Sequence, residues 1–333
     1  MSKRVLGAAL AVTLFASTGI AAAADIEPAV VFDMGGKFDK SFNEGVYNGV
    51  EKFKEETGIK YREFEVTNET QREQAIARMA SRGANPVLGV GFAQALAIEK
   101  VAKENPKVRF AIIDSVVDLP NVRSVVFKEH EGSFLVGVLA AMASKTGKVG
   151  FVGGMDIPLI RRFACGYVQG VKHARADAQV FQNMTGTTPS AWNDPTKGGE
   201  LARSQFDRGA DVIYAAAGGT GLGVYQAAAD SGKLAIGVDS NQNYLHPGTM
   251  LTSMLKRVDV AAYKAFMDAK NDKFTSGVQV LGLAEGGIDW ALDEHNKALI
   301  TDAMKAAVDK AKAGIVDGSI KVHDYMADSS CPG

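Results

Sequence analysis

The sequence has little of what marks disordered, fibrous or strongly charged proteins. Only 9 of its 333 residues are proline, and 46% are hydrophobic against 23% charged, a composition typical of ordinary globular proteins. Basic and acidic residues nearly balance, at 37 and 38, so no broad basic face is expected and nucleic acid is not an expected partner. The length corresponds to about two domains of roughly 150 residues each.

The common signatures of enzyme active sites are also missing. No G-x-S-x-G nucleophile elbow and no G-x-x-x-x-G-K-[ST] phosphate loop occurs. The glycine-rich stretch at 218–223 lacks the G-x-G-x-x-G spacing of a dinucleotide site. The five histidines are scattered, with no i, i+4 pair that would suggest zinc. We therefore predict no catalytic residue, no metal and no cofactor.

A long apolar run is found only at the start of the chain. Residues 5–20 follow Lys3 and Arg4 and precede the small residues 21–24, the pattern of a cleavable export signal. No second hydrophobic span follows, and no cysteine lies near the cleavage site. We predict a signal peptide at 1–24, cleavage near Ala24, and a non-lipidated product that is free in the periplasm.

Two cysteines, Cys165 and Cys331, remain in the exported part. An oxidising compartment favours a bridge between them, since no metal-like spacing accompanies the pair. The alternative is a buried thiol at Cys165 and a free thiol at Cys331. The sequence does not decide between these, because it does not show whether the two residues approach each other.

Apolar runs alternate with amphipathic segments along the first half of the exported chain. Strands are predicted at 29–33, 61–66, 86–90, 108–113 and 122–127, and helices at 41–56, 70–81 and 93–104. Continuous apolar strands separated by amphipathic helices indicate a parallel sheet that is covered on both faces.

The same organisation repeats in the second half. Helices are predicted at 132–144, 158–174, 195–209 and 221–231, and strands at 149–152, 180–184, 212–216 and 234–238. With no low-complexity linker between the halves, the pattern favours two α/β lobes joined by short crossovers. We expect an N-terminal lobe of residues 25–128 plus about 257–285, and a C-terminal lobe of 129–256 plus about 286–333.

Unusual polar and small residues follow several predicted strands. Asp33 follows the first strand, Asp114 the fourth, and Gly218 and Asp239 follow two strands of the second half. In open α/β sheets, ligands bind outside the carboxyl ends of the strands. The sequence therefore predicts one cleft that these strand ends share.

Six motifs carry a resemblance to a known family. They are FDMGGKFDKSFNEG at 32–45, FKEHEGSFLVG at 127–137, GFVGG at 150–154, WNDPTKG at 192–198, AGGTGLGV at 217–224 and GVDSNQ at 237–242. As an ordered set they resemble the basic membrane protein (BMP) family, the purine-nucleoside receptors of ABC importers. The resemblance implies a type I two-lobe periplasmic-binding-protein fold, a monomer, a purine nucleoside or base as ligand, and an ABC permease in the inner membrane as partner.

A flat, uncharged base needs an aromatic face on which to stack. Phe42 is the leading candidate, and Phe163 and Trp192 are candidates for the opposite face. Packing in the core is the alternative explanation for each of the three.

The polar edge of a base must be matched once water leaves, because an unpaired buried polar group is costly. Asp33, Asn43 and Asp114 are the candidates. Similarity to the family implies that Asp33 and Asp114 lie at strand ends facing the ligand and that Asn43 lies beside Phe42. For Asp33 and Asn43, helix capping or turn stabilisation is the alternative role.

A ribose presents two neighbouring hydroxyls, which a carboxylate can accept as a pair. Asp239 is the candidate, with Lys256 balancing its charge and donating to hydroxyl oxygens. Gly218 and Gly219 would let the backbone approach the sugar and expose N–H groups at a helix start. For Asp239 and Lys256 the alternative is an exposed ion pair. For the two glycines it is a simple tight turn between strand and helix.

The sequence thus predicts a binding protein that closes its lobes over a purine nucleoside and presents it to a permease. A sugar or free-base receptor on the same scaffold is an open alternative, and a nucleosidase is a further one.

Overall fold

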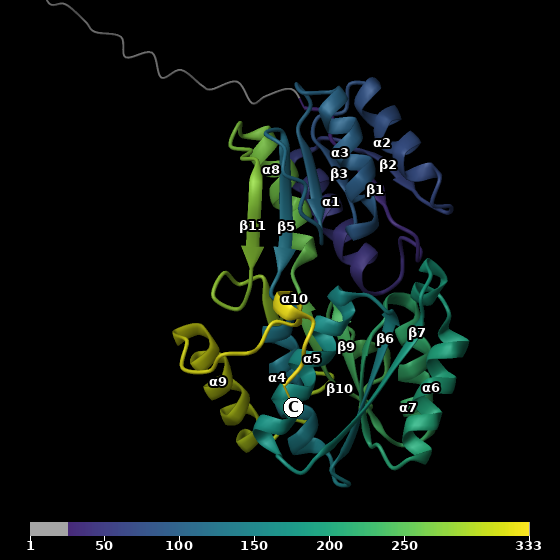
Figure 1. Ribbon diagram of the computed structural model, residues 1–333, viewed down its shortest axis with the longest axis vertical. Coiled ribbons are helices and arrows are strands. Elements are labelled where there is room, and N and C mark those ends of the chain that lie inside the picture. Colours follow the sequence, from purple (N-terminus) through teal and green to yellow (C-terminus); the bar gives the residue numbers. More distant parts are fainter. Residues whose placement is uncertain (1–25, 333) are drawn as a thin grey trace, which may run out of the picture.

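The computed structural model describes residues 26–332, and the predicted signal peptide therefore lies outside the described part. It contains two α/β lobes, one above the other in Figure 1. Within residues 26–332 no helix has the length and apolar character needed to span a membrane.

The first lobe is built on a six-stranded sheet in the order β11-β5-β4-β3-β1-β2, in which every neighbouring pair is parallel. Its strands are β1 (Ala29–Phe32), β2 (Arg62–Glu65), β3 (Val87–Gly89), β4 (Phe110–Ile113), β5 (Val122–Phe127) and β11 (Gly277–Leu281). Its helices are α1 (Phe42–Thr57), α2 (Gln71–Ser81), the short η1 (Phe92–Gln94), α3 (Ala95–Glu104) and α8 (Val258–Lys270).

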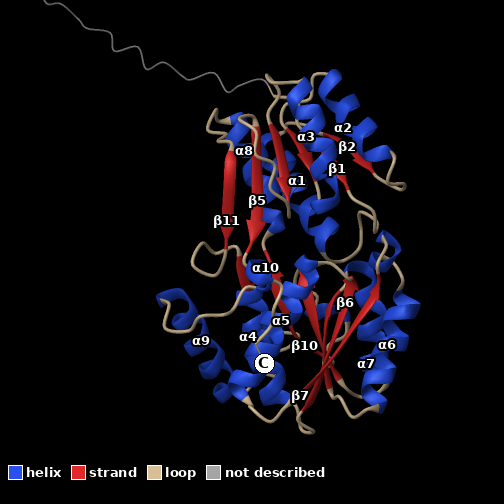
Figure 2. Ribbon diagram, in the orientation of Figure 1, coloured by secondary structure: helices blue, strands red, loops and turns tan. Residues whose placement is uncertain are grey.

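The second lobe contains a sheet in the order β12-β10-β9-β8-β6-β7. Its strands are β6 (Lys148–Met155), β7 (Gln179–Gly186), β8 (Val212–Ala216), β9 (Leu234–Asp239), β10 (Met250–Lys256) and β12 (Ile288–Trp290). Its helices are α4 (Glu129–Ala143), α5 (Pro158–Ala174), η2 (Pro189–Trp192), α6 (Pro195–Asp207), η3 (Gly218–Thr220), α7 (Gly221–Asp230), η4 (Asn243–Leu245), α9 (Asp302–Asp317) and α10 (Tyr325–Asp328). Figure 2 shows these helices flanking the strands.

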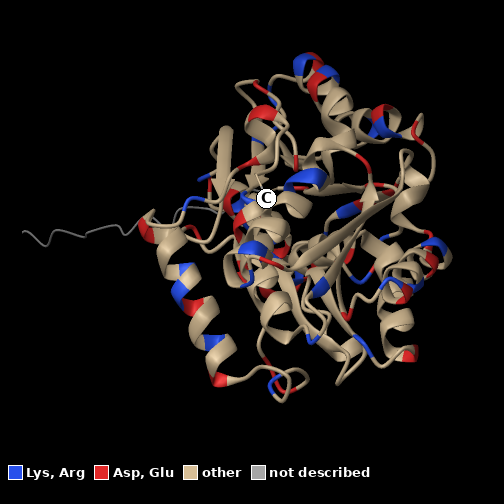
Figure 3. Cartoon of the chain, turned by 60° about the horizontal axis from the view of Figure 1, so that its bottom comes forward, with Lys and Arg blue, Asp and Glu red and all other residues tan. Residues whose placement is uncertain are grey.

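Each sheet is buried between two layers of helices. Helix α1 packs with α8 and α2 with α3 in the first lobe, while α4 packs with α5 and α6 with α7 in the second. One hydrophobic core runs without interruption from the α1–α8 layer into the α4–α5 layer, and a smaller core fills the opposite side of each sheet. The predicted α/β architecture is confirmed. Figure 3 shows basic and acidic positions interspersed along the outer helices.

The chain crosses between the lobes at three places, after β5, after β10 and after β11. The crossovers are bonded to one another, because Lys128 donates its N–H to Leu281 and Arg257 donates to Gly287, at 3.0 and 2.9 Å. We propose that the lobe boundaries lie at these crossovers, as the sequence predicts.

The last strands are the part of the fold that the sequence analysis did not identify. Strand β10 has seven residues that mix apolar with hydroxyl side chains, and the three-residue β12 pairs with it antiparallel. Both lie where the chain no longer alternates strand with long helix, so the periodicity gave no signal.

Helices α4 and α5 approach each other so closely that only glycine fits at several positions. A Cβ atom on Gly170 would lie 2.0 Å from the carbonyl oxygen of Phe134 in α4. The conflict is with backbone, which cannot rotate away. Helix α5 therefore holds a fixed position against α4.

Replacing Gly170 with alanine is expected to lower the free energy of unfolding by about 1–3 kcal/mol, because α5 must move off α4. Gly186 in β7 is the matched control, since a Cβ there would meet its nearest neighbour, Ala191, at an ordinary 3.6 Å. Urea denaturation of both variants makes the comparison. Equal stability of the two would contradict the close packing.

Candidate functional site

A cavity lies where the two lobes face each other, and residues of both lobes line it. In Figure 1, β5 and β11 of the first lobe point with their carboxyl ends toward the second lobe. The cavity is lined by Asp33, Met34, Asp39, Phe42, Asn43, Gly91, Phe92, Asp114, Leu159, Ile160, Phe163, Trp192, Ala216, Ala217, Gly218, Val238, Asp239 and Lys256.

Nearly all of the predicted contact residues lie around this cavity. The structure brings together Asp33, Phe42, Asn43, Asp114, Phe163, Trp192, Gly218, Asp239 and Lys256. Gly219 is not part of the lining. It is buried, and a Cβ there would lie 3.3 Å from the carbonyl oxygen of Trp192.

Asp39 is a cavity residue that the sequence analysis did not single out. Its carboxylate accepts backbone N–H groups from Ser41 at 2.8 Å, Asn43 at 3.0 Å and Glu44 at 3.1 Å. These are donors at the start of α1 that have no partner within the helix. Asp39 therefore fixes the first turn of α1, which carries Phe42 and Asn43 into the cavity. The aspartate before an S-F-N sequence was the signal for this cap.

Burial raises the pKa of Asp39 to about 7, against the lowering effect of its backbone N–H donors. Between the ordinary value of 3.8 and about 7, the folded protein holds a proton that the unfolded chain releases. The free energy of unfolding is therefore expected to fall as the pH rises from about 4 to about 7. Melting curves across this range should show the slope, and Asp39→Asn should reduce it. An unchanged slope in the variant would assign the effect elsewhere.

Asp33 is paired within the first lobe. Its Oδ1 accepts from Nε and Nη2 of Arg72 at 3.2 and 3.1 Å, and both side chains are mostly buried. Burial raises the pKa of Asp33, and the guanidinium of Arg72 opposes the shift. Arg72 lies on α2 and was missed, because the sequence does not show which helix reaches the end of β1.

Lys256 is the central charge of the site, and its partners differ from those predicted. Its Nζ lies 2.7 Å from Asp114 Oδ2 and 2.9 Å from Glu129 Oε1, whereas the sequence analysis paired it with Asp239. The side chains of Lys256 and Glu129 are only 2% and 1% exposed, so the alternative of an exposed ion pair is wrong. The charge of Lys256 does oppose the raised pKa of Asp239. Glu129 follows the first crossover and was not predicted.

The three buried carboxylates around Lys256 shape its charge state. Burial alone would lower the pKa of Lys256, but Asp114, Glu129 and Asp239 together raise it. Burial raises the pKa of Asp114 while the ammonium of Lys256 opposes the shift. The cluster is therefore a buried cation shared by two acids, with Asp239 close enough to contribute.

Asp239 connects the lobes. Its Oδ2 accepts from the hydroxyl of Ser41 at 2.6 Å, and burial raises its pKa. Both Asp114 and Asp239 have positive φ angles, 70° and 64°, which are unfavourable for residues with side chains. Such strain concentrates at functional sites. Here it occurs at two strand ends that border the cavity.

Further hydrogen bonds join the lobes beside Asp239. The hydroxyl of Ser240 donates to the carbonyl oxygen of Ser41 at 2.9 Å, and Gln242 Nε2 donates to the carbonyl oxygen of Lys40 at 2.9 Å. The segment before α1 is therefore hydrogen-bonded to the loop after β9, and the lobes are in contact on one side of the cavity.

The aromatic residues surround the cavity from both lobes. Lys256 Nζ lies 5.3 Å from the ring centre of Phe42 and 5.5 Å from that of Phe163, so the two rings flank the ammonium. The ring of Trp192 lies over Gly154, where a Cβ would come within 2.2 Å of it. The last glycine of the GFVGG motif is thus explained by the indole packed on it.

A family model described as ABC transporter substrate-binding protein PnrA-like matches residues 26–324. The chain belongs to the Bmp family. The ABC transporter nucleoside-binding protein BmpA of Lactococcus lactis subsp. cremoris is 34% identical over 321 residues, which cover 90% of this chain and 89% of that protein. The resemblance found in the sequence is confirmed.

The fold of the Bmp protein also matches a solved structure. An ABC transporter solute-binding protein from Aeropyrum pernix K1 aligns with a TM-score of 0.82 and 30% identity, covering 89% of this chain and 92% of that one. The Bmp family consists of substrate-binding proteins of ABC transporters and not of enzymes. Such proteins bind a small molecule and deliver it to a permease.

The predicted localisation is wrong. A relative from Pyrococcus furiosus, 34% identical over 288 residues, which cover 80% of this chain and 71% of that protein, is named an uncharacterized lipoprotein. Another from Borreliella burgdorferi is named basic membrane protein D. These names contradict a free, non-lipidated periplasmic product, and we do not retain it. The prediction rested only on the absence of a cysteine near the cleavage site.

Proposed function

We propose that this Bmp protein captures a purine nucleoside between its lobes and delivers it to an ABC permease. The observation that carries the proposal is the composition of the interlobe cavity, which combines aromatic rings with buried carboxylates. A neutral heterocycle needs the rings, and a pentose needs a paired acceptor for its hydroxyls. The nucleoside-binding relative from Lactococcus lactis supports the same choice.

We assign the base to the end of the cavity that holds Phe42, Phe163 and Asp114. Among the described residues, Asn43 Oδ1 and Asp114 Oδ1 are buried acceptors without a hydrogen-bond partner. Buried acceptors of this kind favour a ligand that brings N–H donors. The ring nitrogens and amino groups of purines supply such donors.

We assign the ribose to Asp239 and the backbone at Gly218. Asp239 Oδ2 already accepts from Ser41, and two neighbouring hydroxyls of a sugar could share the same carboxylate. Gly218 lines the cavity with a φ of 57°, a conformation that glycine adopts without strain, and this leaves the backbone accessible.

Lobe closure follows from the same contacts. Ser41 of the first lobe and Asp239 of the second meet at the edge of the cavity, so a ligand that engages both lobes would favour the closed state. A permease can then distinguish loaded from empty protein by the relative position of the lobes.

Isothermal titration calorimetry against adenosine, guanosine, inosine, hypoxanthine and ribose tests the proposal. We expect a nucleoside to bind with a Kd of about 1 µM or tighter, equivalent to about −8 kcal/mol. Ultraviolet spectra of freshly purified, denatured protein should also reveal a co-purified purine. Binding of ribose alone would indicate a sugar receptor, tighter binding of hypoxanthine a free-base receptor, and cleavage of inosine a nucleosidase.

A further inference from the structure

The last described part of the chain, residues 319–332, runs along α5 and is fastened to it at three positions. We call this segment the strap; it includes α10, which lies beside α5 and close to the interlobe region in Figure 1. Cys331 of the strap is disulfide-bonded to Cys165, with their Cα atoms 5.5 Å apart. Gln169 exchanges two hydrogen bonds with the backbone of His323, at 2.8 and 3.0 Å.

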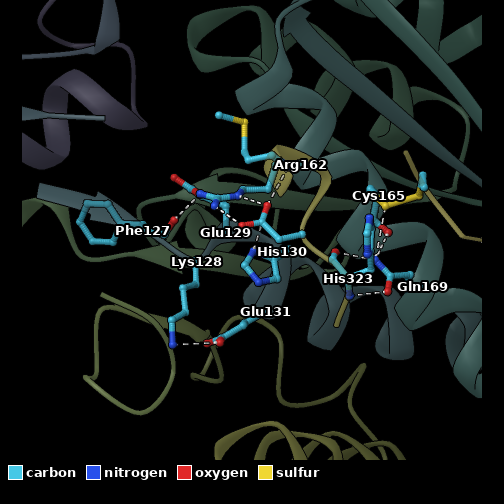
Figure 4. Close-up of polar contacts among 12 residues, drawn as sticks. Phe127, Lys128, Glu129, His130, Glu131, Arg162, Cys165, Gln169 and His323 are labelled. Carbon is cyan, nitrogen blue, oxygen red and sulfur yellow. Dashed lines mark hydrogen bonds and ion pairs between the residues drawn. A yellow bond between two sulfur atoms is a disulfide. The ribbon is translucent and has the colours of Figure 1, made fainter. Parts of the chain in front are cut away.

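The third attachment is ionic. Nε of Arg162 donates to Asp324 Oδ1 at 2.7 Å, and Nη2 donates to the other oxygen of the same carboxylate. Arg162, Cys165 and Gln169 are spaced i, i+3 and i+7, so they form one stripe along α5. Figure 4 shows Gln169 and His323 paired next to the Cys165 disulfide, with Arg162 between this group and Phe127.

The same first turns of α5 that hold the strap also border the cavity. Leu159, Ile160 and Phe163 line it, and Arg162 is the immediate neighbour of Phe163. The strap and the cavity therefore contact different sides of one helix end.

Arg162 links the strap to the first crossover between the lobes. Its Nη1 donates to the carbonyl oxygen of Phe127 at 2.7 Å and to Glu129 Oε2 at 2.9 Å. Figure 4 shows Arg162 over Glu129, with Phe127 at the start of the crossover. The guanidinium thus holds the crossover with one nitrogen and the strap with the other two.

Glu129 connects Arg162 to the ligand site. Its Oε2 binds Arg162, while its Oε1 lies 2.9 Å from Lys256 Nζ, which in turn binds Asp114 in the cavity. The strap is therefore connected to the predicted base-reading carboxylate through an alternating series of charges: Asp324, Arg162, Glu129, Lys256 and Asp114.

We propose that the strap is a positioning element of the ligand site, and that Asp324 and the Cys165–Cys331 disulfide tune nucleoside affinity through Arg162, Glu129 and Lys256. The inference rests on the proposed function for its ligand. Without Asp324, Arg162 keeps Glu129 as its only close carboxylate among the described residues, and it competes with Lys256 for that side chain. The placement of Lys256 beside Asp114 is then no longer fixed.

Asp324→Asn tests this directly, with inosine as the probe. We expect the Kd to rise roughly 10-fold, since members of one ionic network are energetically coupled. Asp324→Glu should restore most of the affinity. Asp156→Asn is the matched control. It breaks the ion pair of Asp156 with Arg161, the residue that precedes Arg162 in α5, and should leave the Kd unchanged.

The disulfide provides a second arm. Cys331→Ser should raise the Kd by a similar factor. The Kd of the double variant with Asp324→Asn should not exceed the higher of the two single-variant values, because both substitutions act through the strap. Full additivity, or a wild-type Kd in Asp324→Asn, would overturn the inference.

Hydrogen exchange in the ligand-free protein separates this inference from the proposed function. In Asp324→Asn, but not in Asp156→Asn, backbone amides of residues 127–131 and 256–258 should exchange faster than in the unmodified protein. If inosine does not bind the unmodified protein, the nucleoside assignment fails, while the exchange result still decides the strap's role. Unchanged exchange at both segments would show that the strap does not position the crossover.

Discussion

Replacing Lys256 with methionine will abolish measurable nucleoside binding and lower the free energy of unfolding by about 3–5 kcal/mol. Methionine fills a similar volume but leaves Asp114 and Glu129 as buried carboxylates without their shared cation. Breaking a buried pair by removing one partner is costly for this reason. Calorimetry with inosine and urea denaturation measure the two effects.

The matched control for this prediction is Lys312→Met. Lys312 pairs with Asp289 at 2.7 Å, but both side chains are more than a third exposed, so the loss should be within about 1 kcal/mol. A Lys256 variant no less stable than the Lys312 variant would contradict the assignment of Lys256 as the central buried charge.

The stability deficit of Lys256→Met should depend on pH. Burial already raises the pKa of Asp114, and removing the ammonium of Lys256 takes away an opposing influence. The folded variant then holds a proton on Asp114 at pH values where the unfolded chain has lost it, so its stability falls as the pH rises. We expect a smaller difference from the unmodified protein near pH 5 than near pH 8.

Replacing Asp239 with alanine will weaken nucleoside binding by about 100-fold or more, while the folded state is retained. Two charge-assisted hydrogen bonds to the ribose would be lost, each contributing roughly 1.5–3 kcal/mol. Alanine does not relieve the positive φ of this position, and Ser41 loses its acceptor, so we expect a modest fall in melting temperature with a normal circular dichroism spectrum.

The free base provides the internal control for Asp239. Hypoxanthine has no sugar, so its affinity should change far less than that of inosine in the Asp239→Ala variant. An unchanged Kd for inosine would remove Asp239 from the ribose contact. An equal loss for inosine and hypoxanthine would mean that the variant disturbs lobe closure through Ser41 and does not report on the sugar.

Much of the site was predictable because strand ends are local features of a sequence. Asp33, Asp114 and Asp239 each follow an apolar run, and parallel strands place such positions at one edge of a sheet. The motif around Phe42 and Asn43 added the start of α1. The cap formed by Asp39 was harder to foresee, because the N-cap position itself is Ser41 and Asp39 lies two residues before it.

The pairing of charges was not predictable. Lys256 was expected near Asp239, seventeen positions earlier in the chain, but its partners Asp114 and Glu129 come from the fourth strand and the first crossover. Ion pairs between distant segments depend on how two lobes are docked, and a sequence pattern has no information about that distance. Arg72, which pairs with Asp33 from α2, was missed for the same reason.

The sequence by itself determined the alternation of strands and helices, the family, and the residues at the strand ends that border the cavity. Periodicity and strand ends are properties of neighbouring residues. Only the tertiary structure decided the partners of Lys256, the disulfide between Cys165 and Cys331, and the attachment of the strap to α5. These contacts join segments more than a hundred residues apart, and folding alone brings them within bonding distance.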